Sequence, residues 1–148
     1  MSTAHDPQPA PPRTSSGPGR ALVAVYGIFA LAATARGVTQ LATKYAEAPL
    51  AYVLSLVAGI VYVVATVTLA RGTATSRRVA LVAVTVELVG VLTVGTLSLA
   101  DPAAFPRATV WSAYGSGYGF VPLVLPVLGL LWLRRTRPQA PGSSSTSE

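Results

Sequence analysis

The sequence contains no cysteine, one histidine and few charged residues, and each shortage excludes a class of chemistry. Without cysteine, disulfides, zinc-thiolate sites, iron–sulfur clusters and thiol catalysis are excluded. The single histidine, His5, lies in a proline-rich segment, so a catalytic triad or a histidine metal site within one chain lacks its components. Charged residues make up 11% of the 148 residues, against about a quarter in soluble domains. The composition therefore excludes an ordinary soluble domain and indicates an integral membrane protein.

The basic charge balance does not indicate a nucleic-acid partner. The net charge is +6 and the pI is about 10.3, as in many phosphate-binding domains. However, the sequence shows no basic stripe interleaved with aromatic residues, and most arginines flank long apolar runs. This placement is typical of membrane topology signals, so we expect the lipid bilayer, and no nucleic acid, as a partner.

Four apolar segments predict an all-α polytopic membrane protein with a four-transmembrane-helix bundle. Segments 50–70 and 79–99 are each 21 residues long, which matches the ~20 residues that a helix needs to cross a ~30 Å hydrocarbon layer. The first helix is predicted at 21–41. The fourth is predicted at 117–133, where Pro122 and Pro126 should bend it. Valine and threonine are frequent, but an isolated segment in lipid satisfies its backbone hydrogen bonds only as a helix.

Two tails rich in proline, serine and glycine, 1–20 and 134–148, flank the membrane domain and are expected to be disordered. The distribution of Lys and Arg predicts the orientation. With both tails and the loop between the second and third helices on one side, that side carries eight basic residues and the other carries three, so we expect both termini in the cytoplasm. The eight are Arg13, Arg20, Arg71, Arg77, Arg78, Arg134, Arg135 and Arg137, and the three are Arg36, Lys44 and Arg107.

A competing interpretation concerns the first apolar segment. Arg13 and Arg20, the apolar run from Ala21 and the sequence Ala-Thr-Ala at 33–35 together resemble a signal peptide with an A-x-A cleavage site. Cleavage would leave three helices. The unusually long proline-rich lead and a small-residue stripe typical of helix packing favour a retained helix instead.

Small residues at helical spacing predict where the helices pack. Membrane helices associate through close backbone approach at small residues, because lipid tails are as apolar as leucine. An Ala-rich and Gly-rich composition also produces such spacings without an interface. The predicted packing residues are Ala24, Gly27, Ala30 and Thr34 in the first helix, Ala51, Ser55 and Gly59 in the second, and Ala83 and Gly90 in the third.

Glu87 is the one carboxylate inside the predicted helices, and it is the principal candidate for function. An ionised side chain near the bilayer centre costs about 2.5–3.5 kcal/mol on insertion scales, so we expect Glu87 to face the protein interior. It either acts in transport or fixes helix register through a hydrogen bond. Helix depth places Tyr62 level with Glu87, about 12 Å from the inner edge, and predicts Tyr62 as its partner. Arg36 is expected to reach the outer interface instead.

The longest loop, 101–116, carries Phe105, Trp111 and Tyr114 and is expected to lie on the membrane surface. Overlapping its end is the sequence YGSGYGF at 114–120. Glycine–tyrosine runs superficially resemble potassium filters, but a filter needs a pore helix between two spanning helices and fourfold assembly. A flexible turn with interfacial tyrosines is the simpler interpretation.

Residues 22–133 resemble an uncharacterised family of small four-helix membrane proteins of actinobacteria. The resemblance rests on LVAVYGIFALAATAR, EAPLAYVLSLVAGIVYVVATVTLA, ELVGVLTVGTLSL and YGFVPLVLPVLGLLWL, and it omits both tails. It implies a location in the plasma membrane and carries no activity or catalytic residue.

Two function classes remain from the sequence. With Glu87 as the single carboxylate within the helices, no cofactor, no metal and no enzyme activity are expected. The first class is a structural or accessory bundle that associates with itself or with a larger membrane protein. The second is a small proton-coupled transporter using Glu87. A short four-helix chain with one membrane carboxylate is similar in outline to small multidrug exporters, although their glutamate lies in the first helix and Glu87 lies in the third.

Overall fold

The computed structural model describes residues 17–137, and every regular element in that range is helical, which confirms the all-helical prediction there. Most of the two predicted tails, residues 1–16 and 138–148, lies outside the described residues. The elements, in chain order, are α1 Pro18–Lys44, η1 Tyr45–Glu47, α2 Pro49–Arg71, α3 Ala74–Ala100, η2 Ser112–Tyr118 and α4 Val121–Arg135.

The turn between α2 and α3 explains why α3 begins earlier than residue 79. Gly72 ends α2 in the left-handed conformation, with its N–H donating to the Thr68 carbonyl. Thr73 then caps α3 in a reciprocal capping box with Ser76. Because this cap sets the helix start, Arg77 lies within the first turns of α3 and not in a loop.

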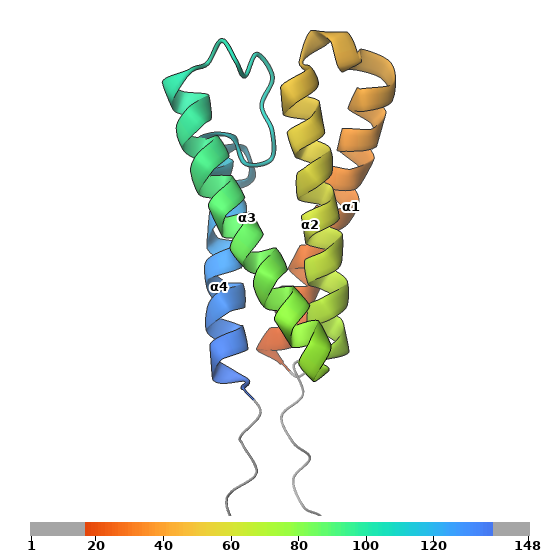
Figure 1. The fold of residues 1–148 in the computed structure, drawn as a ribbon, viewed down its shortest axis with the longest axis vertical. Coiled ribbons are helices and arrows are strands. Elements are labelled where there is room, and N and C mark those ends of the chain that lie inside the picture. Colours follow the sequence, from red (N-terminus) through yellow and green to blue (C-terminus); the bar gives the residue numbers. More distant parts are fainter. Residues whose placement is uncertain (1–16, 138–148) are drawn as a thin grey trace, which may run out of the picture.

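The four long helices stand side by side in antiparallel order (Figure 1). Contacts are most extensive between α1 and α2, followed by α2 with α3 and α3 with α4, whereas α1 and α4 touch little. The start of α1 and the end of α4 lie at the same end of the bundle, here called the terminal end. The opposite end, which holds the 101–120 connection, is called the loop end (Figure 1).

The fourth predicted span is a broken element. With 15 residues, α4 measures about 22 Å, less than a ~30 Å hydrocarbon layer. It meets η2 at a bend of 100°, and the break falls at Gly119 and Phe120, which both have left-handed backbone. Pro122 lies in the first turn, where a missing N–H leaves no hydrogen bond unmade. Pro126 lies inside α4. The 100° break precedes both prolines, so it is not the bend that Pro122 and Pro126 were expected to cause in 117–133.

Three of the described helices are long and apolar enough to cross a membrane, or four if the bent pair is one span. Their large apolar side chains point outward, as with Leu31, Ile28 and Val82, which are 76%, 64% and 63% exposed. The interior holds alanines, valines, several leucines and the tyrosines, together with the carboxyl group of Glu87. Large apolar side chains on the outside and a carboxyl group on the inside are the arrangement expected of helices that lie in lipid.

The α1–α2 contact depends on two glycines. A Cβ added at Gly59 would lie 2.9 Å from the backbone nitrogen of Thr34, and one added at Gly37 would lie 2.9 Å from the Cα of Leu56. No side chain fits at either point, so the two backbones approach directly. Gly27, by contrast, has its nearest neighbour at 3.7 Å, an ordinary contact.

The predicted small-residue stripe on α1 is offset from the buried one. Among the nine predicted packing residues, Ala30, Ala51, Ser55, Gly59 and Ala83 are buried, Gly27, Thr34 and Gly90 are half-buried, and Ala24 is exposed. The buried face of α1 instead follows spacings of three, four, four, three and four, and shares one residue with the predicted stripe. It consists of Gly19, Leu22, Tyr26, Ala30, Ala33 and Gly37.

Candidate functional site

Glu87 lies at the centre of the bundle. Because α3 runs from residue 74 to 100, Glu87 is its middle residue, 13 positions from either end (87 − 74 and 100 − 87). Its side chain is 0% exposed. It is thus about 20 Å from each end of α3, deeper than the 12 Å expected when the helix was placed at 79–99. The expectation that it faces the protein interior is met.

The partner of Glu87 is Tyr26 and not the expected Tyr62. The Tyr26 hydroxyl of α1 donates to Oε2 of Glu87 across 2.7 Å, and both side chains are fully buried. The other carboxyl oxygen, Oε1, is buried without a hydrogen-bond partner among the described residues. The depth count compared α2 with α3 and placed Tyr62 near the level of Glu87, where its ring does lie beside Tyr26. Depth does not say which side chain faces the carboxyl group, and the count was not applied to Tyr26 on α1, which makes the hydrogen bond.

Tyr62 of α2 belongs to the same site by another contact. Its hydroxyl accepts a hydrogen bond of 3.1 Å from the indole N–H of Trp111. Its ring stands 6.2 Å from that of Tyr26 and 5.7 Å from that of Phe29, between centroids. These separations are within the range of favourable aromatic pairs. Tyr62 therefore connects the Glu87 site to the long loop.

Helix α4 closes the remaining side of the site through a glycine. A Cβ at Gly129 would lie 3.1 Å from a methyl carbon of Val84 and 3.2 Å from the Tyr26 hydroxyl oxygen. The absence of a side chain there allows α4 to pack against the Tyr26–Glu87 pair. All four long helices consequently meet at this level of the bundle.

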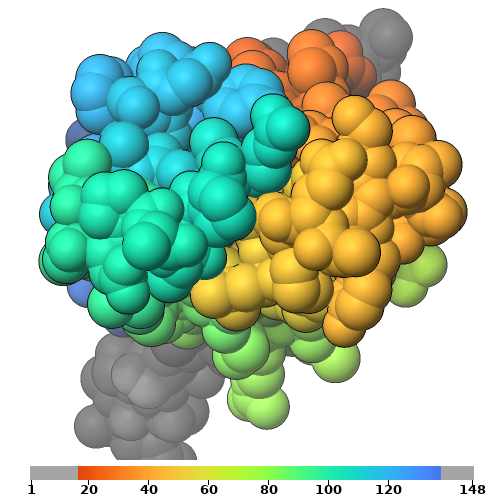
Figure 2. Space-filling view, turned by 90° about the horizontal axis from the view of Figure 1, so that it is seen from above, coloured from red at the N-terminus to blue at the C-terminus, as the bar shows by residue number. Residues whose placement is uncertain are grey.

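The loop 101–116 was expected to lie on the membrane surface, but part of it inserts between the helices. Thr109, Val110 and Trp111 are buried, and the Trp111 ring occupies the space above Gly90, where a Cβ would lie 2.7 Å from the ring. Gly90 thus accommodates a loop side chain and not a helix. Viewed onto the loop end, this teal segment covers the region between α3 and the α1–α2 pair (Figure 2).

The loop turns back through unusual backbone. Ala113, Tyr114 and Gly115 in succession adopt positive φ, as do Gly119 and Phe120. Such angles are costly for residues other than glycine and persist where packing fixes them. Here the Tyr114 ring packs against Gly95 of α3, and its hydroxyl hydrogen-bonds Thr96 across 2.9 Å.

Arg36 anchors the loop from α1, at a distance from Glu87. Its guanidinium donates to the Tyr118 hydroxyl at 2.5 Å and to the Ala108 carbonyl at 3.0 Å. The side chain is half-buried and directed toward the loop end, where both of its hydrogen-bond partners lie. Tyr118 belongs to the YGSGYGF run, which in the structure forms the last five residues of η2 and the break that follows.

The site offers limited chemistry. It contains one carboxyl group, two tyrosine hydroxyls and one indole N–H, so it can hold or exchange a proton and form hydrogen bonds. Within residues 17–137, no three side chains of the His, Cys, Asp and Glu types gather as a metal site would require. Sequence reasoning missed Tyr26 and Trp111; the spacing of Tyr26 from Ala30 and Ala33, i+4 and i+7, was the available signal for Tyr26.

No protein-family model matches the chain, and comparisons with characterised proteins and with solved structures also give no match. Only the arrangement of the residues themselves therefore bears on the function of this chain.

Proposed function

We propose that this chain is an integral, multi-pass protein of the plasma membrane with both termini in the cytoplasm. The outward-facing apolar side chains along α1, α2 and α3 support insertion. The excess of arginines at the terminal end supports the orientation, because that end carries Arg71, Arg77, Arg78, Arg134 and Arg135.

Its proposed role is that of a structural or accessory helix bundle, associating with itself or with a larger membrane protein. The observation that carries this proposal is the complete burial of Glu87 under the Trp111 loop, with Tyr26 as its hydrogen-bond donor. A transported solute would need a polar route to the carboxyl group. In the described part of the chain, Tyr26 is the hydrogen-bond partner of Glu87, and the buried core of the bundle is predominantly apolar.

The second candidate is a proton-coupled transporter using Glu87, and one observation favours it. Oε1 of Glu87 is buried with no hydrogen-bond partner in residues 17–137. Buried polar atoms nearly always have a hydrogen-bond partner. A buried carboxyl oxygen without one is a feature found at functional sites. In this candidate, Trp111 and the loop would have to withdraw before a solute reached the carboxyl group.

Substituting Glu87→Gln separates the two candidates. Glutamine keeps the shape and can still accept from Tyr26, but it does not exchange a proton at neutral pH. For the accessory role, the variant should remain folded in the membrane and give the same crosslinked products in native membranes as the unchanged chain. A transporter should lose its proton-coupled transport or resistance phenotype while the folded protein is still present.

A matched variant guards against misinterpretation. Thr85→Val alters an exposed side chain of the same helix, whose hydroxyl bonds only its own helix at Leu81. It should behave as the unchanged chain in every assay. If Glu87→Gln loses the crosslinked products and Thr85→Val keeps them, the shape of the side chain at position 87 is not sufficient for association. That result would contradict a purely structural role for Glu87.

A further inference from the structure

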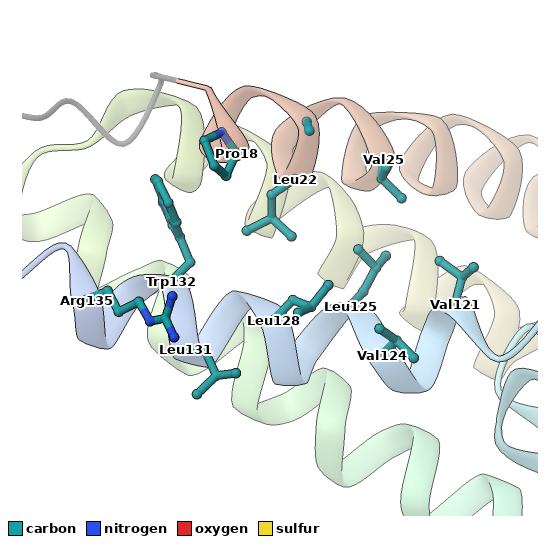
Figure 3. A pocket seen from close by; sticks show the side chains of 11 residues that line it. Pro18, Leu22, Val25, Val121, Val124, Leu125, Leu128, Leu131, Trp132 and Arg135 are labelled. Atoms are coloured by element: carbon teal, nitrogen blue, oxygen red, sulfur yellow. The ribbon is translucent and has the colours of Figure 1, made fainter.

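An apolar groove separates α1 from α4 toward the terminal end of the bundle. Its volume is about 670 Å³, within the range of small-molecule sites in proteins. Leu22 and Val25 of α1 face Leu125 of α4 across it (Figure 3). Ten of its eleven lining residues are apolar or aromatic, among them Leu128 and Trp132 of α4.

The eleventh lining residue, Arg135, gives the groove a charged end. It lies beside Trp132 and across from Pro18, at the terminal end (Figure 3). Within residues 17–137, its guanidinium has no hydrogen-bond or ion-pair partner. Arg77 shows the contrast, because it is engaged with the Leu133 carbonyl and with Thr136 Oγ1.

The first turn of α1 adds positive potential at the same end. Pro18 lines the groove and is the first residue of α1, and Gly17 before it supplies no side-chain cap. The N-terminus of a helix carries partial positive charge and favours anions. A long apolar surface that terminates in one guanidinium and one helix N-terminus is complementary to an amphiphile with an anionic head.

We infer that the α1–α4 groove binds an anionic glycerophospholipid, with an acyl chain along the apolar walls and the phosphate at Arg135. Basic pockets between membrane helices at the cytoplasmic side are known to receive anionic headgroups. Trp132 fits the same level, since tryptophan concentrates at the membrane interface. The inference rests on the proposed membrane location and orientation, but not on either candidate role for Glu87.

The test uses the full-length protein in mild detergent, with bound lipid counted by native mass spectrometry. Phosphatidylglycerol and phosphatidylcholine of identical chains are compared. We expect the unchanged chain to prefer phosphatidylglycerol, and Arg135→Gln to lower its affinity about fivefold, the effect of removing one basic contact near a membrane surface. Arg134→Gln, which removes the neighbouring exposed arginine outside the groove lining, should keep the preference.

A second variant tests the groove itself. Leu128→Trp adds bulk to its wall at a half-exposed position on α4, and should reduce the binding of both lipids while leaving the thermal unfolding temperature unchanged. Equal binding of the two lipids, an equal effect of Arg134→Gln, or occupation of the groove by a second copy of the chain would each overturn the inference. Extraction of the protein from membranes by alkaline carbonate would instead overturn the membrane location, so the two failures are distinguishable.

Discussion

The Tyr26 hydroxyl donates a 2.7 Å hydrogen bond to Oε2 of Glu87, and this contact joins the first and third helices across 61 positions of sequence. Both residues are 0% exposed. Around this pair, α2 contributes Tyr62 and α4 contributes the bare backbone of Gly129. The bond therefore marks the point where the whole bundle converges, and substitutions near it test the architecture most directly.

Tyr26→Phe should destabilise the bundle by about 1 kcal/mol, the scale of an interhelical hydrogen bond in membranes. The substitution keeps the ring and its packing but leaves both oxygens of Glu87 without a donor. Thermal unfolding in detergent measures the change. In a Glu87→Leu background the same substitution should have little further effect, and equal losses in both backgrounds would show that the hydrogen bond contributes nothing.

Gly37→Ala should cost about 1–3 kcal/mol, because a methyl group is forced into a closed backbone contact. Its Cβ would lie 2.9 Å from Leu56 backbone atoms, which cannot rotate away. Gly27→Ala on the same helix is the control: its nearest neighbour lies at 3.7 Å, and alanine favours helix over glycine by about 1 kcal/mol. The opposite order of unfolding temperatures would contradict the α1–α2 contact as described.

Gly90→Ala should displace the Trp111 ring, since the new Cβ would lie 2.7 Å from Cζ3. In a Trp132→Phe background, Trp111 is the sole tryptophan and its fluorescence reports the change. Acrylamide should quench it more strongly once the ring leaves its buried position. Gly117→Ala, with open space at its Cβ, should leave quenching unchanged; if both variants behave alike, the loop does not insert as described.

Arg77→Met should loosen the last turn of α4. The guanidinium donates to the Leu133 carbonyl and to Thr136 Oγ1, and it thereby satisfies groups that a helix end leaves free. Hydrogen–deuterium exchange of a peptide covering 130–137 should become several-fold faster. Arg78→Met removes an exposed neighbour and should not change the rate, and similar exchange in the two variants would contradict the role given to Arg77.

The absence of cysteine allows the proposed topology to be mapped with single introduced thiols. Thr75→Cys places one at the terminal end, beside the α2–α3 turn, and Ala103→Cys places one in the loop, both at exposed positions. In intact cells, a membrane-impermeant maleimide should label the thiol at position 103 and should reach the thiol at position 75 only after permeabilisation. The reverse labelling pattern would show that the orientation is opposite to the proposed one.

The sequence predicted the elements of this fold more securely than their contacts. The scarcity of charge and four apolar runs predicted an all-helical chain, and the structure has helices at each run. Helix ends differed where side chains outside the apolar run set them, as the capping box of Thr73 and Ser76 does for α3. Hydropathy counts apolar residues and does not detect these local hydrogen bonds.

The packing face of α1 was also predicted less securely than the helix itself. Spacings of three and four predicted a stripe through Ala24, Gly27 and Ala30, yet the buried face passes through Tyr26 and Gly37. Several alanine and glycine stripes are compatible with α1, and only the shape of α2 decides which one packs. Size alone was therefore an ambiguous signal in a composition rich in small residues.

By itself, the sequence determined the helical class and the inward orientation of Glu87, because exposing a carboxylate to lipid is costly near the middle of a membrane-spanning helix. The tertiary structure decided which residues meet that carboxyl group. Tyr26 and Trp111 reach the site because of helix offset and because a loop folds back between helices. Neither feature produces a periodic pattern in the sequence, because both depend on how separate helices shift and tilt against one another when they pack.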